Sequence, residues 1–385
     1  MDEPNRPIYL DYNATTPHDP EVIEAMRPYL EEHFGNPSSS HWYGRKTREA
    51  VETARAQVAA LLNCKPSEVI FTSGGTESNN YAIRSTALAR RSHGMHIITS
   101  QIEHPAVTAV CERLRQEGFE TTYLPVDEYG LVGIGDVEKA IRPETILITL
   151  MHANNEVGTI QPIKEVARLV KSRGIAFHTD AAQSAGKIST DVSALGVDLL
   201  SIAGHKLYAP KGVGALYVRE GIVLTPLMQG AGQEGGRRPG TENVLEIVGL
   251  GKACEIALRD LAVNHEHMRR MRDRLEAGFL ERVAYVSVNG HPDKRLPNTL
   301  SASVEGVDAN ALLAAIEEKV AASAGAACHS GQVHVSHVLQ AMRVPEKWAR
   351  GTLRFSTGRM TTEADIDAAV AVVSSAAEQL RGERW

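Results

Sequence analysis

Cysteine is scarce in this sequence, and long apolar runs are missing. The 385 residues include four cysteines, which lie far apart at positions 64, 111, 254 and 328. This spacing does not fit the dense cysteine pairs of a disulfide-stabilised secreted domain. No segment approaches the ~18 apolar residues of a membrane span, and the opening MDEPNRPIYLDYN lacks the apolar stretch of a signal peptide. We therefore expect a reduced, soluble, cytoplasmic protein.

Strong net charge is also absent. Lysine and arginine total 41 and aspartate and glutamate total 47, so the formal net charge is −6. This mild acidity disfavours a general polyanion binder, and nothing indicates a basic groove for nucleic acid. With 43% hydrophobic and 23% charged residues, the composition is that of an ordinary globular protein, and the length suggests two or three domains.

Strand and helix patterns alternate between residues 69 and 218. The strand runs are continuously apolar, which is typical of a sheet buried on both faces. Patterned helices fill most of the gaps, as in 162–174, where Gly174 follows the last helical turn. We therefore predict an α/β fold with a mostly parallel, doubly wound sheet, built from the runs VIFTS (69–73), HIITS (96–100), TTYLPV (121–126), TILITLM (145–151), IAFHTD (175–180), LLSIAG (199–204) and GALYV (214–218). The nine residues HKLYAPKGV between the last two runs are too few for a crossover helix, so we predict a hairpin with one antiparallel strand.

The chain changes character after a glycine-rich segment at 229–240. Beyond it, a long helix is followed by short strands around 285–288 and 298–304, a helix over 309–320, and a last helix that opens with a capping-box pattern at Thr362. Another helix is expected ahead of the sheet, near 45–62. The predicted domains are a large cofactor-binding α/β domain and a smaller α+β domain that carries the fourth cysteine, with bounds of 15–250 for the first and 1–14 plus 251–385 for the second.

Lys206 lies where parallel sheets place their ligands. It follows the apolar run 199–204 and His205, at the expected carboxyl edge of the sheet. A solvated loop lysine is the ordinary alternative, and Lys211 fits that description. A desolvated lysine with a lowered pKa is the residue type needed to form a Schiff base with a carbonyl cofactor.

A glycine-rich turn lies at the same predicted edge. In FTSGGTESN (71–79) a strand runs into a helix start, so the backbone N–H groups of Gly75 and Thr76 face outward and suit a phosphate. No Gly-Lys-Ser/Thr follows, so the turn is not a Walker loop. An ordinary strand-to-helix turn is an equal alternative.

Three more strand ends carry polar side chains. Asp180 ends one strand, with Gln183 on the next turn, and an acid there suits a protonated ring nitrogen or a helix N-cap. Amides follow another strand at 151–158. His104 follows a third, where it would stack on an aromatic ring or cap the next helix. Together with Lys206 and the phosphate cup, these side chains describe a pyridoxal phosphate site.

The fourth cysteine differs from the other three, which fall in helical patterns and are expected as small core residues. Cys328 lies among small residues in 321–339, a composition typical of an exposed, mobile loop in which a thiol serves chemistry. A zinc site is a less favoured alternative, because the spacing from Cys328 to the local histidines matches no standard zinc motif; these are His329, His334 and His337. Arg354, in a later strand, suits a substrate carboxylate or a surface ion pair.

The chain resembles the cysteine desulfurases, which are class V, fold type I pyridoxal phosphate enzymes. The motifs that carry this resemblance span almost the whole chain, and together they are more specific than any one of them. They are YLDYNATTP (9–17), GNPSSSH (35–41), FTSGGTESNN (71–80), EH (103–104), NNEVGTIQPI (154–163), HTDAAQ (178–183), GHKLYAPKGVGALYV (204–218), RPGTEN (238–243), ACHS (327–330) and RFSTGR (354–359).

The resemblance implies a role for each site residue. It makes Lys206 the covalent cofactor anchor and Cα base, Cys328 the nucleophile that takes up sulfur as a persulfide, and His104 a ring-stacking residue that assists proton transfer. The substrate carboxylate would be held by Asn155 and Arg354. The implied cofactor-binding residues are Gly75, Thr76, His104, Asn155, Asp180, Gln183, His205, Lys206 and Thr241, the last from the partner subunit of a homodimer.

The implied reaction converts L-cysteine to L-alanine and passes the sulfur to an acceptor protein, such as an iron–sulfur scaffold or a thiolation enzyme. One departure is Ala203, which replaces a serine that often donates to the phosphate. The Ala-Gly-His-Lys version, like the segment 229–240 and the Cys-His-Ser at 328–330, is more similar to selenocysteine lyases. The alternatives are therefore a selenocysteine lyase, a class V aminotransferase that does not need Cys328, and a non-enzymatic, metal-binding sulfur carrier.

Overall fold

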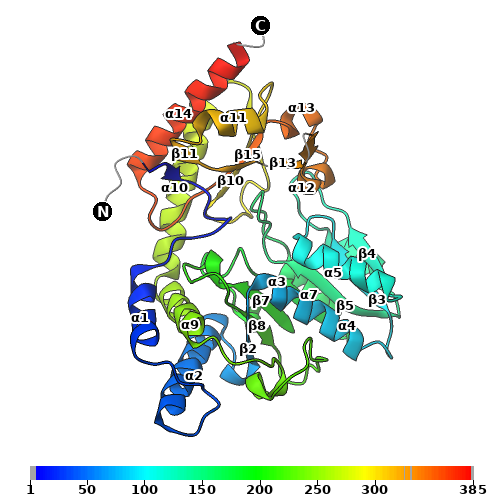
Figure 1. The fold of residues 1–385 in the computed structure, drawn as a ribbon. Helices are drawn as coiled ribbons and strands as arrows, with labels where there is room; N and C mark the ends of the chain where they lie inside the picture. Colours follow the sequence, from blue (N-terminus) through cyan, green and yellow to red (C-terminus); the bar gives the residue numbers. More distant parts are fainter. Residues whose placement is uncertain (1–5, 325, 330–331, 383–385) are drawn as a thin grey trace.

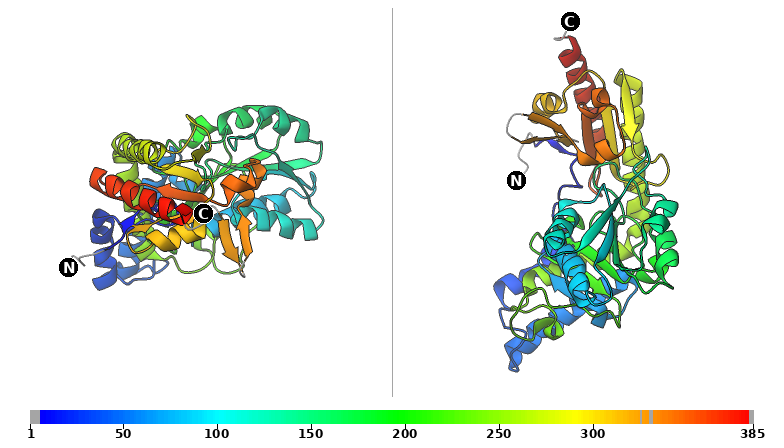
Figure 2. Two further views of the ribbon diagram at one scale, coloured as in Figure 1. Left: turned by 90° about the horizontal axis from the view of Figure 1, so that it is seen from above. Right: turned by 90° about the vertical axis from the view of Figure 1, so that its right-hand side faces the viewer.

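The seven-stranded sheet and the four-stranded sheet lie one above the other (Figure 1), and the right-hand view of Figure 2 shows the smaller of these above the larger. The computed structural model describes residues 6–324, 326–329 and 332–382, with the side chains of all of these except 326–329 and 332–334. No helix in this part of the chain has the length and hydropathy of a membrane span.

Within the described residues, seven strands form the larger sheet in the order β2-β8-β7-β6-β5-β3-β4. Pairing is parallel from β7 through β4, whereas β8 runs antiparallel to β2 and to β7. The mostly parallel sheet and the hairpin across residues 205–213 are therefore both confirmed. The strands are β2 (Val69–Thr72), β3 (His96–Ser100), β4 (Glu120–Leu124), β5 (Thr145–Met151), β6 (Ala176–Asp180), β7 (Leu199–Ala203) and β8 (Gly214–Val218).

Both faces of this sheet are covered by helices, as its continuous apolar strands predict. Successive strand residues point to opposite faces, so Ile97 packs in one buried cluster with helix α5 while Ile98 packs in another with α2 and α9. The predicted helix near 45–62 is α2, which begins at Trp42 behind a His41 cap. The helices are α1 (Pro20–Glu31), α2 (Trp42–Leu62), α3 (Gly75–Asn80), α4 (Thr86–Ala89), α5 (Pro105–Gln116), α6 (Ile134–Ala140), α7 (Ile163–Val170), α8 (Val192–Leu195) and α9 (Val244–Arg259).

The smaller sheet is antiparallel and has its own buried cluster, which includes Met271, Leu300 and Phe355. In the described residues its order is β12-β15-β10-β9, and a short β1 (Ile8–Tyr9) pairs in parallel with β11 (Val320–Ala321) nearby. The other elements are α10 (Leu261–Arg282), β9 (Val286–Asn289), β10 (Thr299–Val304), α11 (Ala309–Ile316), β12 (Ser323–Ala324), α12 (His337–Ala341), α13 (Glu346–Ala349), β15 (Thr352–Ser356) and α14 (Glu363–Gly382).

This α+β arrangement and the capping box of α14 are confirmed, since the Thr362 hydroxyl accepts from the Asp365 N–H and the Asp365 carboxylate accepts from the Thr362 N–H. The helix predicted over 309–320 ends earlier, at Ile316, because Val320 enters strand β11. The domain bounds proposed from the sequence stay a prediction.

The segment around Cys328 does not form the loop that its composition predicts. Ala326–His329 (β13) pairs antiparallel with Gln332–Val335 (β14), which sets Cys328 opposite Val333. The small residues before and around Cys328 indicate a loop, but the alternation of β-branched Val333 and Val335 favours a strand. The side chain of Cys328 itself lies outside the described residues.

Candidate active site

A cavity of about 280 Å³ lies at the carboxyl edge of the larger sheet. Its wall includes the last residues of three parallel strands, Met151 of β5, Asp180 of β6 and Ala203 of β7, which is where such a sheet places a ligand. The predicted site residues that line it are Gly75, Thr76, His104, Asn155, Asp180, Gln183, His205, Lys206 and Arg354.

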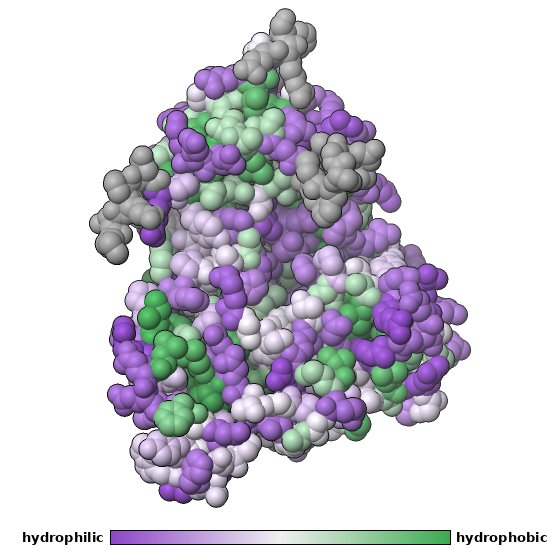
Figure 3. Space-filling model, in the orientation of Figure 1, coloured by the Kyte–Doolittle hydropathy of each residue, from purple (hydrophilic) through white to green (hydrophobic). Residues whose placement is uncertain are grey.

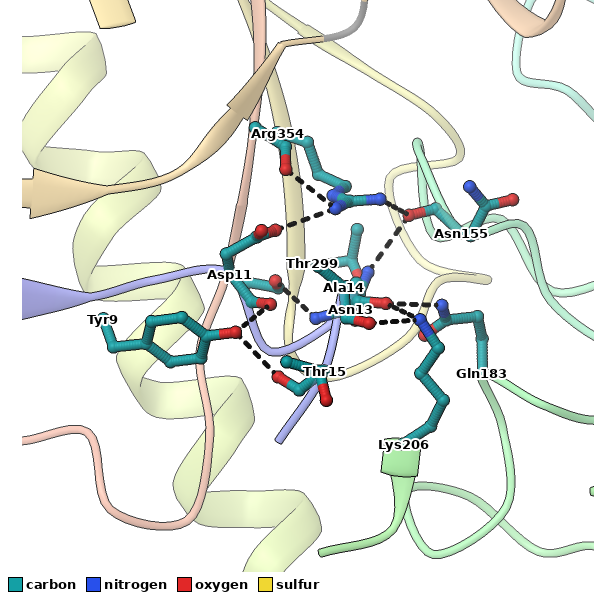
Figure 4. Close-up of polar contacts among 12 residues, drawn as sticks. Tyr9, Asp11, Asn13, Ala14, Thr15, Asn155, Gln183, Lys206, Thr299 and Arg354 are labelled. Carbon is teal, nitrogen blue, oxygen red and sulfur yellow. Dashed lines mark hydrogen bonds and ion pairs between the residues drawn. The ribbon is translucent and has the colours of Figure 1, made fainter. Parts of the chain in front are cut away.

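The amine of Lys206 is held by backbone oxygens. Lys206 ends a short 3-10 turn after β7, and its Nζ donates to the carbonyl oxygens of Asn13, at 2.5 Å, and Ala14, at 2.7 Å (Figure 4). Burial and the positive charge of Arg354 lower the pKa of Lys206 to about 8, although Asp11 and Asp180 act to raise it. Part of this lysine is therefore a neutral, nucleophilic amine near neutral pH, as the sequence position suggests.

Asp180 is a buried acid that faces the cavity. One carboxylate oxygen accepts from Asn79 Nδ2 at 2.6 Å and the other from the Ala182 N–H at 2.9 Å. Burial raises the pKa of Asp180, while these two hydrogen bonds and the charges of His104 and Lys206 lower it. Within the described part of the chain, no cationic side chain lies within ion-pair distance of this carboxylate, which leaves it available to a cation in the cavity.

His104 combines the two alternatives that the sequence offers. It caps helix α5, where its Nδ1 accepts from the Ala106 N–H at 3.1 Å, and its ring also lines the cavity. Burial lowers the pKa of His104, the Asp180 carboxylate acts to raise it, and the charges of Lys206 and His337 lower it further. The ring is therefore neutral near pH 7, with its proton on Nε2 and its face available for stacking.

The predicted phosphate cup begins where α3 meets the end of β7. Gly75 is the first residue of α3, and a Cβ at this position would lie 3.1 Å from the Ala203 Cβ, so glycine allows the close approach. His205 bonds to the Thr15 hydroxyl through Nδ1 at 3.3 Å. Burial and the charges of Lys206 and Lys211 lower the pKa of His205 to about 4, so it is a neutral hydrogen-bonding group.

Arg354 reaches the cavity from strand β15 of the smaller sheet. Its guanidinium donates to Asp11 Oδ1 at 2.8 Å and to the backbone oxygen of Asn155 at 3.1 Å (Figure 4). The side chains of this Arg354–Asp11 pair are 11% and 17% exposed, so the pair is partly buried and not the surface ion pair of the sequence-based alternative.

Two residues at this site, Asn13 and Asn79, are not predicted from the sequence. Asn13 donates to Asn155 and Thr299 through its side chain, and its carbonyl oxygen accepts from Lys206 and Gln183. Asn79 orients Asp180. Both lie in motifs quoted above, but nothing in the sequence shows which acceptors an amide will meet.

Other predicted residues are not gathered at the cavity. Thr241 is exposed and does not line it, as expected if it serves a second subunit. The described side chains contain no metal-ligating group of three, while Cys328, His329 and His334 of the zinc alternative lie outside those side chains. Of that set, His337 is described, and its Nε2 bonds to the backbone oxygen of Glu103 at 3.0 Å.

Comparison with known proteins agrees with this geometry. The family model "Aminotransferase class-V" matches residues 8–369. A protein named cysteine desulfurase IscS from Dictyoglomus turgidum is 48% identical over 98% of this chain and 96% of its own length. This chain belongs to the cysteine desulfurase family. A second member of the family, from Methanosarcina thermophila and also named cysteine desulfurase IscS, is 47% identical over 98% of this chain and 93% of its own length.

Solved structures of related proteins have the same fold. A structure titled NifS-like protein superposes with a TM-score of 0.92 at 37% identity, over 97% of this chain and all of that one. A structure titled SspA in complex with cysteine gives a TM-score of 0.80 at 39% identity, over 92% of this chain and 99% of that one. The fold type I predicted from the sequence is therefore confirmed for this chain.

Enzymes of the cysteine desulfurase family use pyridoxal phosphate, which is the cofactor of this chain. The residues present fit it. A buried carboxylate with no cationic partner among the described residues suits a protonated ring nitrogen, a neutral imidazole lines the same cavity, and an amine of lowered pKa suits covalent attachment.

Proposed function

We propose that this protein is a cysteine desulfurase that converts L-cysteine to L-alanine and takes up the sulfur on Cys328 as a persulfide. The observation that carries the proposal is the cavity in which the Lys206 amine, the Asp180 carboxylate and the neutral His104 ring meet. It is supported by relatives of 48% identity that carry the name cysteine desulfurase.

The site residues divide by the part of the cofactor that they would hold. Asp180 would pair with the ring nitrogen, His104 would stack on the ring, and Gln183 and Asn155 would approach the ring hydroxyl. Gly75, Thr76 and His205 would bind the phosphate, joined by Thr241 of a second copy. The cofactor, when bound, supplies an electron sink for charge that develops at the substrate Cα.

The chain's own groups move the proton and the sulfur. The Lys206 amine takes the Cα proton, for which its lowered pKa leaves it partly neutral. Arg354 faces the cavity with a guanidinium suited to the substrate carboxylate. In the overall transfer, the C–S bond of the substrate breaks and an S–S bond to Cys328 forms. The proton that the Cys328 thiol loses accounts for the additional hydrogen in the methyl group of alanine.

The decisive experiment incubates the holoenzyme with L-cysteine and measures alanine release and the intact mass. We expect alanine and the added mass of one sulfur atom, both lost in Cys328→Ala. Cys64→Ala is the matched control, because burial raises the pKa of the Cys64 thiol to about 12 and leaves it unreactive. Sulfur on the Cys328→Ala protein would contradict the proposal, and transamination that survives this substitution would favour a class V aminotransferase.

A second candidate, selenocysteine lyase, is favoured by Ala203, which lines the cavity in place of a hydroxyl donor. Parallel assays of alanine release from cysteine and selenocysteine separate the two activities. If cysteine is inert and selenocysteine is turned over, the first proposal fails.

The quaternary state and location follow as further parts of the proposal. We infer a homodimer from the apolar surface that this chain exposes. The ring of Phe34 is 81% exposed and stacks on that of Tyr43 at 5.3 Å, and apolar residues also gather on the molecular surface over α1 and α9 (Figure 3). Exposed apolar surface of this kind is typical of a protein–protein interface. A cytoplasmic location is supported by the free thiols of Cys64, Cys111 and Cys254. The sulfur acceptor would be an iron–sulfur scaffold or a thiolation enzyme.

A further inference from the structure

Lys187 is a buried lysine that the proposed reaction does not use. It lies four residues after Gln183 in the turn segment that follows β6, and it is 4% exposed. Within the described residues its amine forms no ion pair with a carboxylate. Burying an unpaired cation costs stability, so such a lysine calls for a reason.

The amine bonds to two side-chain amides of the active site. Nζ donates to Gln183 Oε1 at 3.1 Å and to Asn13 Oδ1 at 3.2 Å. An amine nitrogen that donates twice requires an oxygen, not an NH₂ group, at both contacts. Lys187 therefore fixes which end of each amide faces it.

This constraint determines what Gln183 presents to the cavity. With Oε1 bound to Lys187, Gln183 Nε2 donates one proton to the Asn13 carbonyl oxygen at 3.0 Å. Gln183 lines the cavity, and within the described residues its second N–H proton meets no protein acceptor. A flipped amide would present an oxygen to the ligand instead of this donor.

The same constraint reaches Lys206 through Asn13. Asn13 Oδ1 accepts from both Lys187 and Asn298, its Nδ2 donates to Thr299 and to the Asn155 oxygen, and its backbone oxygen accepts from the Lys206 amine. Asn13 is 1% exposed. The Lys187 amine thus contacts both Gln183 and Asn13, and it shares the orientation of the Asn13 amide with Asn298 and Thr299.

We propose that Lys187 is a positioning residue of the active site, whose amine fixes the amides of Gln183 and Asn13 so that Gln183 donates an N–H to the ring oxygen of the bound cofactor. The inference rests on the proposed function, since it concerns the same cavity. The charged groups that act on Lys187 are Lys206 and Arg354, and His265 bonds to its backbone oxygen at 3.1 Å. Burial, together with these two cations, lowers the pKa of Lys187 to about 7. The neutral amine still has two N–H donors for the Gln183 and Asn13 side-chain oxygens, and the ammonium form has donors only.

The test is a pH titration of the visible absorption band of the holoenzyme without substrate, in wild type and Lys187→Met. A hydrogen-bond donor to the ring oxygen favours the deprotonated form of the chromophore. Loss of this donor should raise the midpoint by about one pH unit. Lys171→Met, an exposed lysine, is the matched control and should leave the midpoint unchanged.

A double variant shows whether Lys187 acts through Gln183. Gln183→Leu alone should raise the midpoint, and adding Lys187→Met should then change it little, because the two share one path. Fully additive shifts, or an unchanged midpoint in Lys187→Met, would overturn the inference. Lys187→Gln, which keeps a donor to one amide, should give a smaller shift and carries the test if the methionine variant does not fold. Failure of wild type to acquire the band would instead refute the proposed function.

Discussion

Burial lowers the pKa of Lys206 most, and charges that other elements bring to it shift the pKa further. Arg354 lowers its pKa and Asp11 raises it, and these two side chains bond to each other. Removing Arg354 in Arg354→Met should therefore raise the pKa of Lys206 twice over, by loss of a cation and by release of an anion.

The measurement is the rate at which apo-protein attaches pyridoxal phosphate as a function of pH. A neutral amine is required, so the rate should rise with pH around a midpoint near 8 in wild type and around a higher pH in the variant. Lys171→Met should match wild type. A midpoint that falls or stays in Arg354→Met would show that this arginine does not control Lys206.

Lys187 should also be visible in the stability of the apo-protein. Its folded pKa of about 7 lies below the ~10.4 of an unfolded lysine, so between these values the unfolded chain binds more protons, and stability rises with pH. The cost of burying the cation is greatest below pH 7 and is lost by about pH 10.

Lys187→Met should therefore be more stable than wild type by an amount that is largest near pH 6 and shrinks towards pH 10. Urea unfolding of both apo-proteins at several pH values measures this difference. A difference that does not change with pH would mean that Lys187 does not titrate in this range. A role of Lys187 in function would explain why the chain has a buried lysine that lowers its stability.

At the scale of elements, one buried ion pair ties the glycine-rich segment to the larger sheet. Arg55 of α2 donates to both oxygens of Glu234, at 2.7 and 2.8 Å, and Glu234 also accepts from the Phe71 N–H of β2 at 3.1 Å. Both side chains are 9% exposed or less. This segment leads to Thr241, so its anchoring also places that residue.

Glu234→Ala removes the buried carboxylate from Arg55, which keeps Glu52 and the Val69 oxygen, and leaves the Phe71 N–H without its Glu234 acceptor. It should lower the free energy of unfolding by about 3 kcal/mol. Glu220→Ala breaks the exposed pair with Lys65 and should cost much less. Urea denaturation of the two variants compares these costs. Equal losses would show that burial does not govern the Arg55–Glu234 pair.

The sequence predicts what depends on neighbours along the chain. The strands of the larger sheet, the hairpin before β8 and the positions of Asp180 and Lys206 at strand ends all follow from local apolar runs and loop lengths. The Asn13 contacts and the Arg354–Asp11 pair do not, because each joins residues more than 140 positions apart. The hairpin β13–β14 is not predicted, because the small residues around Cys328 are typical of a loop.

For the whole molecule, the exposed aromatic residues Trp42 and Tyr43 at the start of α2, and Phe34 in the segment before it, lead us to expect a dimer. Phe34→Asp should yield monomers of 41.7 kDa in light scattering and should weaken pyridoxal phosphate binding, because Thr241 would no longer reach a second site. Tyr285→Asp, at a residue that is 72% exposed and far from α2 in the sequence, is the control and should leave the mass unchanged. A dimeric Phe34→Asp protein would exclude this surface as the interface.

The N-terminal segment has a consequence for biosynthesis. Its residues are synthesised long before residues 320–356, yet Ile8 pairs with Val320, Asp11 with Arg354, and the Asn13 N–H with Ser356. The carbonyl oxygens that receive the Lys206 amine are therefore held in part by residues that leave the ribosome much later. A nascent chain cannot assemble its chemistry early, so sulfur release must wait until residues 320–356 have been synthesised and folded.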